Sequence, residues 1–359
     1  MKIRELLKSL ALIIPFTRSC YIEFYIRRTN LSNVIWGGGI FIDEINKYVD
    51  IKLTENERKN TRLLRRIVKD IVYSYIRYGA TPQEYFMFGF RDQRHSYRKR
   101  YLTNRHKDEV MIRVEGLKSL YDDLENKNNF YQKFKHYFNR EVLLLDKETH
   151  ESDFEQFVCK HSRFMAKPIS GQCGKGIEII DITEGNRDRV FHDLVERDDF
   201  LLEELIIQDD RMAEWNGTSV NTVRIPTFIK DNTFTVLKPF FRTGRRGSVV
   251  DNGGSGGVFS MIDERTGELI TEGYDENGRR YECHPDSGCK YKGWAIPRWN
   301  ELLILVEECH RHFNGHRYIG WDFALTKDGW VLIEGNWGQF LSEFTEIGGI
   351  KKQFDELMR

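Results

Sequence analysis

The chain has 359 residues and a formal net charge of zero, because lysine plus arginine and aspartate plus glutamate each number 55. This length allows about two or three domains. Contents of 40% hydrophobic and 31% charged residues are typical of a soluble globular protein. A balanced charge provides no overall field toward a polyanion, so we expect no nucleic-acid partner.

The cysteine pattern indicates a reducing compartment. The six cysteines are scattered and form no CxxC pair, which predicts free thiols and a cytoplasmic location. Cys283, His284 and Cys289 lie close in sequence, but a second pair of ligands is missing. We therefore do not expect a zinc site there.

The first segment of the chain has two interpretations. Residues Leu6 to Phe16 are apolar apart from Lys8, with basic residues on both sides, and are too short to span a bilayer. The segment is either an amphipathic helix packed on the fold or a helix resting at the inner membrane face. The second interpretation predicts peripheral membrane contact.

Residues 1–115 are predicted to be mostly helical. Apolar residues recur at helical spacing from Asn56 to Tyr78, and Gly79 and Pro82 end the pattern. The following run from Arg91 to Lys107 is dense in arginine, lysine and histidine. It is either a solvated face or a surface for an anionic substrate or lipid headgroup.

From about residue 140, short strands replace most of the helical signals. The pattern predicts strands at 141–145 and 164–167 with a helix at 151–160 between them. A glycine-rich stretch, Ser170 to Gly176, and a strand at 177–180 follow. Its backbone N–H groups can wrap phosphates as a flexible flap. No helix follows the glycines, which excludes a P-loop and a Rossmann turn.

The strand predicted at 200–205 ends in two carboxylates, Glu203 and Glu204. Such a strand can offer its backbone to an adenine edge, and Asp209 and Asp210 can take ribose hydroxyls. Equally, these acidic side chains can be surface charges at a strand end. The residues alone leave both interpretations open.

Two further strands carry basic residues. Arg224 lies near the end of the strand predicted at 219–225, where it can stabilise charge in a transferring phosphoryl group. The strand predicted at 236–242 contains Lys238. A second glycine-rich loop follows at 251–257, and glycines at this density favour close backbone approach or mobility. A helix is predicted at 300–312.

The stretch from Tyr318 to Gly338 predicts a β-hairpin with few polar residues, namely Asp322, Glu334 and Asn336. A two-residue Asp-Gly turn would pair Phe323 with Glu334. A three-residue loop with Gly329 in the left-handed conformation pairs Asp322 with Glu334 instead. The second register collects one apolar face, so we favour it; that face comprises Trp321, Phe323, Leu325, Val331 and Ile333.

This register places two carboxylates and an amide on one face of the hairpin. Two like charges this close need a cation, and oxygen ligands suit Mg²⁺. The alternative is a strand with a solvated polar face.

Taken together, these elements resemble the ATP-grasp superfamily, and in particular its sugar-transfer associated branch. The resemblance rests on the order of several motifs: Asn126-Lys127, Phe164 to Pro168 with the loop to Gly176, Leu202-Glu-Glu-Leu205, Ser219 to Arg224, Asp251 to Gly257, Gly320-Trp-Asp322 and Glu334-Gly-Asn336.

The resemblance implies an α+β, ATP-grasp fold in which two α+β subdomains clamp ATP beside a mostly helical N-terminal region. The implied divisions are 1–115 for the helical region, 116–202 for the subdomain with the flap and 203–359 for the catalytic subdomain with the hairpin. The implied cofactors are ATP and Mg²⁺.

The resemblance also implies roles for individual residues. Lys127 and Lys167 would reach the phosphates, Arg224 and Lys167 would act in catalysis, and the hairpin would bind Mg²⁺ through Asp322, Glu334 and Asn336. The remaining implied nucleotide contacts are Ser170, Gly171, Gly174, Gly176, Glu203, Glu204, Leu205, Asp210 and Lys238. The substrate would be held by Arg242, Arg245, Asn252, Gly254 and Ser255.

The implied activity is that of an ATP-dependent carboxylate–amine ligase acting through an acyl phosphate. Its substrate would be a small molecule or glycan precursor, such as a sugar acid of the cell envelope. Two alternatives remain: a sugar kinase that uses the same ATP site, and a non-catalytic nucleotide-binding partner of a glycosyltransferase.

Overall fold

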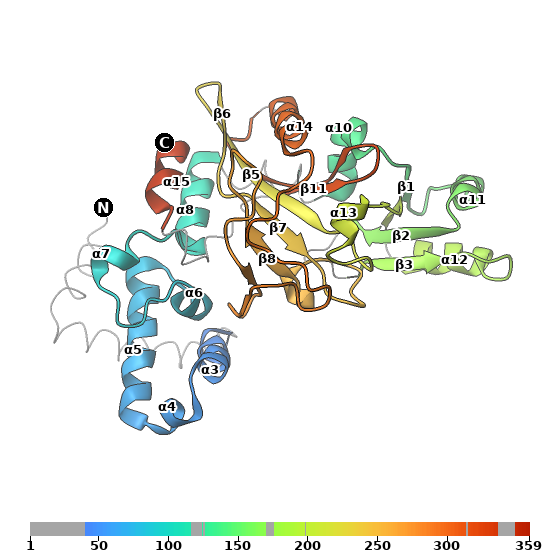
Figure 1. Ribbon diagram of the computed structural model, residues 1–359. Coiled ribbons are helices and arrows are strands. Elements are labelled where there is room, and N and C mark those ends of the chain that lie inside the picture. Colours follow the sequence, from blue (N-terminus) through green and yellow to red (C-terminus); the bar gives the residue numbers. More distant parts are fainter. Residues whose placement is uncertain are drawn as a thin grey trace. The chain divides into compact units, whose positions relative to one another are not determined.

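The computed structural model describes residues 40–115, 124, 126–169, 176–197, 199–313, 315–336 and 349–359. The chain separates into two compact units, Met1–Val114 with Leu341–Arg359 and Glu115–Phe340 (Figure 1). The segment expected to form the first helix lies outside the described residues. Within the described part, no helix combines the length and the apolar character that crossing a membrane requires.

The first unit is built from helices: α3 (Ile40–Lys52), α4 (Glu55–Lys59), α5 (Thr61–Tyr78), α6 (Pro82–Met87), α7 (His95–Arg98), α8 (Asn104–Glu115) and α15 (Lys351–Met358). The helix expected from Asn56 to Tyr78 is in fact two, because the Asn60 side chain accepts a hydrogen bond from the Leu63 N–H and starts α5. Gly79, at a φ of 75°, ends α5 in the left-handed conformation.

Part of the basic run in this unit serves the core and is not a solvated face. Arg98 is 5% exposed, and its guanidinium donates to both carboxylate oxygens of Asp70 at 2.8 and 2.7 Å. Its guanidinium carbon lies 5.7 Å from the centre of the Phe90 ring, and Phe90 belongs to the hydrophobic core of this unit. The stacked rings of Phe88 and Tyr101, 4.8 Å apart, lie in the same core.

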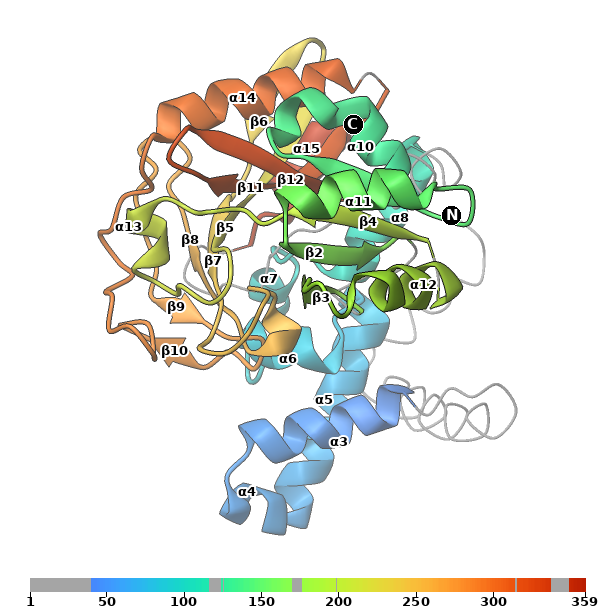
Figure 2. The same ribbon diagram turned by 90° about the vertical axis from the view of Figure 1, so that its right-hand side faces the viewer.

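The second unit begins with a four-stranded antiparallel sheet of β1 (Val142–Leu145), β2 (Arg163–Pro168), β3 (Glu178–Asp181) and β4 (Phe200–Glu204). The strand order is β1-β4-β2-β3. Helices α11 (Glu151–Lys160) and α12 (Arg187–Arg197) lie beside this sheet (Figure 2) and contribute phenylalanines to its core.

The larger sheet has eight strands: β5 (Thr222–Lys230), β6 (Thr233–Val236), β7 (Phe240–Thr243), β8 (Val258–Met261), β9 (Gly273–Tyr274), β10 (Arg280–Tyr281), β11 (Tyr318–Leu325) and β12 (Trp330–Asn336). Its order is β10-β9-β8-β7-β5-β11-β12, with β6 beside β5. Helices α10 (Lys127–Phe138) and α14 (Trp299–His312) supply side chains to its core, and α13 (Asp210–Ala213) is a short connecting helix. Helices and antiparallel sheets together confirm the α+β class.

The strand expected at 236–242 is wrong, because the chain breaks between β6 and β7. Lys238 adopts a φ of 51°, which is outside the β region, and Pro239 follows it. Lys238 therefore lies in a connection between two strands.

The hairpin of β11 and β12 pairs Asp322 directly with Glu334, as expected. The expected three-residue loop is wrong, however. The backbones of Thr326 and Gly329 exchange hydrogen bonds of 2.9 and 3.3 Å, which leaves the two-residue turn 327–328. The turn is thus one residue shorter than the expected register requires.

A bulge in β12 restores the pairing that the shorter turn would shift. Phe323 pairs with Leu332 but Asp322 pairs with Glu334, so Ile333 is an extra residue on β12. Because side chains alternate along a strand, the extra residue returns Glu334 to the face of Asp322.

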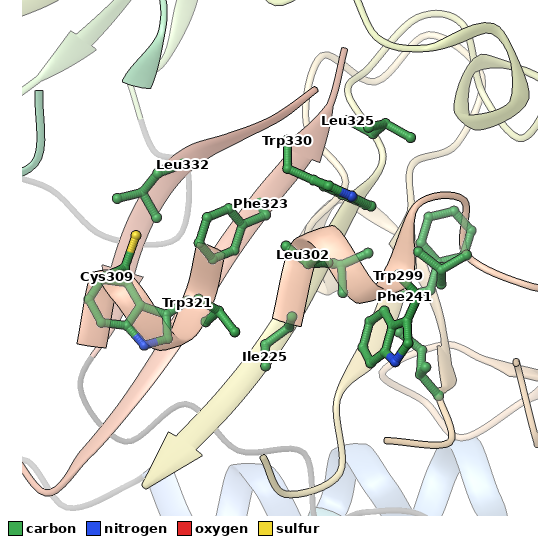
Figure 3. Close-up of a cluster of buried hydrophobic side chains, with 14 of the residues drawn as sticks. Ile225, Phe241, Trp299, Leu302, Cys309, Trp321, Phe323, Leu325, Trp330 and Leu332 are labelled. Atoms are coloured by element: carbon green, nitrogen blue, oxygen red, sulfur yellow. The ribbon is translucent and has the colours of Figure 1, made fainter. Parts of the chain in front are cut away.

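The bulge also corrects the expected apolar face of the hairpin. Between the turn and the bulge, the shorter turn directs Trp330 and Leu332 of β12 into the core. Val331 and Ile333 are therefore not members of the hydrophobic cluster on this sheet. The hairpin residues that are buried together there are Ile319 and the five labelled in Figure 3, namely Trp321, Phe323, Leu325, Trp330 and Leu332.

Helix α10 packs closely on β12 at Gly335. A Cβ atom on Gly335 would lie 2.8 Å from Cε2 of Phe130 and 3.2 Å from Cδ2 of Leu124. Both neighbours are buried, so neither side chain has open space into which it can shift.

We expect Gly335→Ala to lower the free energy of unfolding by about 1–3 kcal/mol, because it overpacks this contact. Urea denaturation measures the loss. Gly185→Ala is the control, since nothing lies within 4 Å of its added Cβ, and it should change stability by about 0.5 kcal/mol or less. Equal effects of the two substitutions would contradict the packing argument.

Candidate active site

Two carboxylates meet on the polar face of the hairpin. The Asp322 side chain is 1% exposed, whereas that of Glu334 is 44% exposed. The amide nitrogen of Asn336 donates to Oε1 of Glu334 at 3.1 Å. The structure therefore brings together all three residues that the sequence suggests as metal ligands.

Arginines from the neighbouring strands converge on Asp322. Arg224 of β5 lies directly across from Asp322 of β11, and its Nε and Nη2 donate to the two carboxylate oxygens. Arg242 of β7 donates from Nη1 to Asp322 Oδ2 at 3.1 Å and from Nη2 to Asp251 Oδ1 at 2.6 Å. Nη2 of Arg224 also lies 3.8 Å from Glu334 Oε1. Charges thus alternate through a largely buried network.

This network separates the acidities of the two hairpin carboxylates. Although burial raises the pKa of Asp322, the guanidinium groups of Arg224 and Arg242 outweigh it and hold that pKa below its ordinary value. Partial burial and the adjacent Asp322 carboxylate raise the pKa of Glu334. Asp322 is therefore a firmly ionised partner of the arginines, and Glu334 is the carboxylate that gains most from an added cation.

The hairpin residues fit Mg²⁺ only as part of a shared coordination sphere. Among the residues that the structure describes, no three or more His, Cys, Asp or Glu side chains form a metal-binding group. Asp322, Glu334 and Asn336 offer oxygen donors, and Mg²⁺ in proteins commonly combines one or two carboxylates with water and substrate phosphates. This donor set suits a metal that arrives with a polyanion.

A second charged cluster lies on the smaller sheet. Lys167 of β2 and Glu203 of β4 lie diagonally on one face, and the Lys167 ammonium is 2.8 Å from Glu203 Oε1. Arg140 donates from Nε to Glu203 Oε2 at 2.8 Å. Burial opposes ionisation of Glu203, but Arg140 and Lys167 lower its pKa to about 2.

The base of the flap lies beside this cluster. The Lys127 ammonium donates to the carbonyl of Ile169 at 3.5 Å, one residue before the flap. Gly176 ends the flap at a φ of 77°. The proposed phosphate contacts Ser170, Gly171 and Gly174 lie outside the described residues.

The remaining residues suggested for the nucleotide have varied surroundings. Glu204 accepts a hydrogen bond from the Glu141 N–H at 3.0 Å, and Leu205 is half-buried just beyond β4. Asp210 is exposed in the first turn of α13. Lys238 Nζ lies 3.1 Å from Glu264 Oε1. The structure does not gather these residues into one cluster.

The residues suggested for the substrate also differ in their contacts. Arg245 donates to both carboxylate oxygens of Asp286, at 2.7 and 3.1 Å. The Asn252 side chain accepts from the Ser255 N–H at 2.8 Å and caps a short 3₁₀ turn in which Gly254 and Ser255 are exposed.

Two charged residues of these clusters are absent from the sequence-based set. Asp251 opens the second glycine-rich loop, so its position after the arginines was a usable signal. Arg140 lies between a helix and a strand, and no motif marks it. Sequence separations of 63 residues to Glu203 and 192 to Leu332 hide its contacts.

Comparison with known proteins identifies one family. The model described as sugar-transfer associated ATP-grasp matches residues 116–353. No curated protein sequence matches the chain significantly.

Solved structures give distant similarities. D-alanyl-alanine synthetase A from Vibrio cholerae has 13% identity and a TM-score of 0.39, over 65% of this chain and 60% of that protein. D-alanine–D-alanine ligase from Bacillus anthracis has 12% identity and a TM-score of 0.40, over 66% of each chain. The ATP-grasp ligase PsnB, complexed with minimal precursor, Mg and ADP, has 12% identity and a TM-score of 0.38, over 66% of this chain and 58% of PsnB. The chain thus spans less than two thirds of these proteins.

We expect Asp322→Asn to destabilise the fold by about 3–5 kcal/mol, because it leaves two buried arginines short of a counter-ion. Glu334→Gln should cost about 1 kcal/mol or less, since that side chain is half exposed and its pair with Arg224 is long. Urea unfolding of the two variants measures the difference. A loss in Glu334→Gln as large as that in Asp322→Asn would contradict the described network.

The depressed pKa of Glu203 predicts a pH dependence of stability. Ionised Glu203 contributes stability that is fully present above the ordinary pKa of 4.5 and is lost as the pH falls toward about 2. We therefore expect wild type to be more stable than Glu203→Gln at pH 7, and the gap to narrow as the pH falls from 4.5 to 2. Urea midpoints across this pH range measure the difference in stability between wild type and variant. An exposed carboxylate variant, Glu301→Gln, should differ from wild type only slightly at every pH. A gap that does not depend on pH would contradict the assignment.

Proposed function

Because the chain belongs to the sugar-transfer associated ATP-grasp family, whose model matches residues 116–353, we propose that it is an ATP-dependent carboxylate–amine ligase. This match confirms the resemblance read from the motifs. The observation that supports the proposal most directly is the convergence of Arg224 and Arg242 on the hairpin carboxylate Asp322. It places strong anion-binding groups beside the residues suited to a divalent cation.

Two steps make up the proposed reaction. A carboxylate oxygen of the substrate forms a bond to the γ-phosphorus of ATP, and the bond from that phosphorus to the β,γ-bridging oxygen breaks to release ADP. An amine then attacks the carbonyl carbon of the acyl phosphate, and inorganic phosphate leaves as the amine loses its proton. No side-chain nucleophile is needed, which agrees with the network of charged residues in the site.

The charged side chains divide the proposed work. Lys127 and Lys167 would bind phosphate oxygens from the base of the flap, as point charges. Arg224 and Arg242 would hold the reacting anions and stabilise the charge that develops during phosphoryl transfer. Glu334, Asn336 and Asp322 would hold Mg²⁺, which when bound neutralises charge on the β- and γ-phosphates.

The proposed substrate is a small molecule or glycan precursor with a carboxylate, such as a sugar acid, which receives an amino-acid-like group. The family description supports this choice of substrate class. Arg245 and Arg246, which follow β7, support a carboxylate substrate on chemical grounds, because guanidinium groups recognise carboxylates in a bidentate manner.

An isotope experiment tests the proposal. A panel of uronic acids and amino acids with ATP and Mg²⁺ is first screened for ADP release. For an active pair, a carboxylate labelled with ¹⁸O should transfer one labelled oxygen to inorganic phosphate, which mass spectrometry detects. We expect Glu334→Gln to lower this activity by about 10-fold to 100-fold and Glu301→Gln, an exposed carboxylate variant on α14, to leave it unchanged. A phosphorylated sugar with no amide product would refute the ligase and favour a kinase.

A further inference from the structure

Arg140 connects the two sheets of the second unit through a side chain that is 4% exposed. It follows α10, whose last turn ends at Asn139 in the left-handed conformation, and it precedes β1. Its guanidinium carbon lies 4.3 Å from the centre of the Phe138 ring, so a cation–π contact helps to hold the group in place.

One edge of this guanidinium belongs to the smaller sheet. Nε donates to Oε2 of Glu203 on β4 at 2.8 Å, and Nη2 lies 2.7 Å from the same oxygen. The other oxygen, Oε1, is 2.8 Å from the ammonium of Lys167. Glu203 is therefore shared between two cations. Without Arg140, Lys167 would be the only one of these two cations left to neutralise the Glu203 carboxylate.

The other edge of the guanidinium belongs to the larger sheet. Nη1 donates to the carbonyl of Leu332 on β12 at 2.8 Å. Because β12 is the last strand in the order of this sheet within the described part of the chain, carbonyls on its outer side have no described strand from which to accept a hydrogen bond. Leu332 directly precedes the bulge residue Ile333, and Glu334 follows it. Arg140 thus anchors the strand at the point where the bulge sets the direction of Glu334.

We propose that Arg140 is a positioning residue that sets both halves of the nucleotide site. It keeps Lys167 available to phosphate by neutralising Glu203, and it keeps Glu334 in place for the metal by anchoring β12. This inference rests on the proposed function, in which Lys167 faces phosphate and Glu334 faces Mg²⁺. The competing interpretation is a purely structural cross-link, which affects stability alone.

A set of variants distinguishes these interpretations through ADP binding, measured by calorimetry on protein shown to be folded by circular dichroism. Arg140→Met should weaken ADP binding without Mg²⁺ by about tenfold, because Glu203 then competes with phosphate for Lys167. Adding Glu203→Gln to this variant should restore most of that affinity, since a neutral amide no longer competes. The enhancement of ADP binding by Mg²⁺ should stay reduced in both, because neither variant anchors β12.

Two further variants serve as controls. Arg140→Lys keeps a cation beside Glu203 with fewer donors, so it should retain Mg²⁺-free ADP affinity and lose part of the Mg²⁺ enhancement. Arg311→Met removes another arginine that joins a carboxylate, Glu307, to a backbone carbonyl, that of Asn232. It should lower the melting temperature and leave ADP binding unchanged.

The outcomes separate this inference from the function on which it rests. If wild type does not bind ADP with or without Mg²⁺, the proposed function and the inference fall together. If wild type binds ADP and Arg140→Met lowers only the melting temperature, the inference alone is overturned. The same holds if Glu203→Gln fails to restore ADP affinity to the folded double variant.

Discussion

The larger sheet depends on how it neutralises one buried carboxylate, Asp322. An ionised carboxylate in this setting is costly unless it is paired and hydrogen-bonded. Arg224 on the adjacent strand β5 makes a bidentate contact with Asp322, and Arg242 on the next strand, β7, adds a third donor. This solution requires β7, β5 and β11 to lie side by side in that order. The ion pairs therefore link the strand order to the site.

The same network explains the unequal availability of the hairpin's oxygen donors. Both oxygens of Asp322 already accept from arginine, whereas Glu334 is half exposed and carries a raised pKa. A cation approaching from solvent meets Glu334 and Asn336 first. On the proposed function, Asp322 would become a full ligand once a bound anion draws the arginines away from it. On the proposed function, the order in which metal and anion bind would thus depend on when the arginines exchange Asp322 for the anion.

The local sequence pattern predicted much of this fold, and the hairpin shows which details such a pattern cannot predict. Alternation of apolar and polar residues was sufficient to pair Asp322 with Glu334. It gave the right pair through a turn one residue too long, because the extra residue belongs to the bulge at Ile333. A sequence pattern cannot separate these two arrangements, since both place the carboxylates together. They differ only in which residues of β12 enter the core, and core packing is a property of the assembled sheet.

The contacts of Arg140 and Arg242 could not be predicted for a related reason. Arg242 meets Asp322 across a separation of 80 residues, and Arg140 meets Leu332 across 192. The motifs marked Lys167 and Glu203 as residues of interest, but they gave them separate roles and did not foresee the ion pair between them. Pairing depends on the diagonal positions of the two residues on adjacent strands. Periodicity within either strand carries no information about that register.

Across both clusters, Lys167, Arg224 and Arg242, which the proposed function assigns to anions, already have carboxylate partners within the chain. Arg140, Lys167, Arg224 and Arg242 are balanced by the same number of carboxylates, Glu203, Asp251, Asp322 and Glu334. A polyanion that binds here must therefore replace carboxylates, and the released carboxylates need a new counter-ion. On the proposed function, Mg²⁺ supplies that charge at Asp322 and Glu334, while Arg140 retains Glu203 when Lys167 turns to phosphate. The balance of fixed charges thus gives a physical reason for nucleotide and metal to bind together.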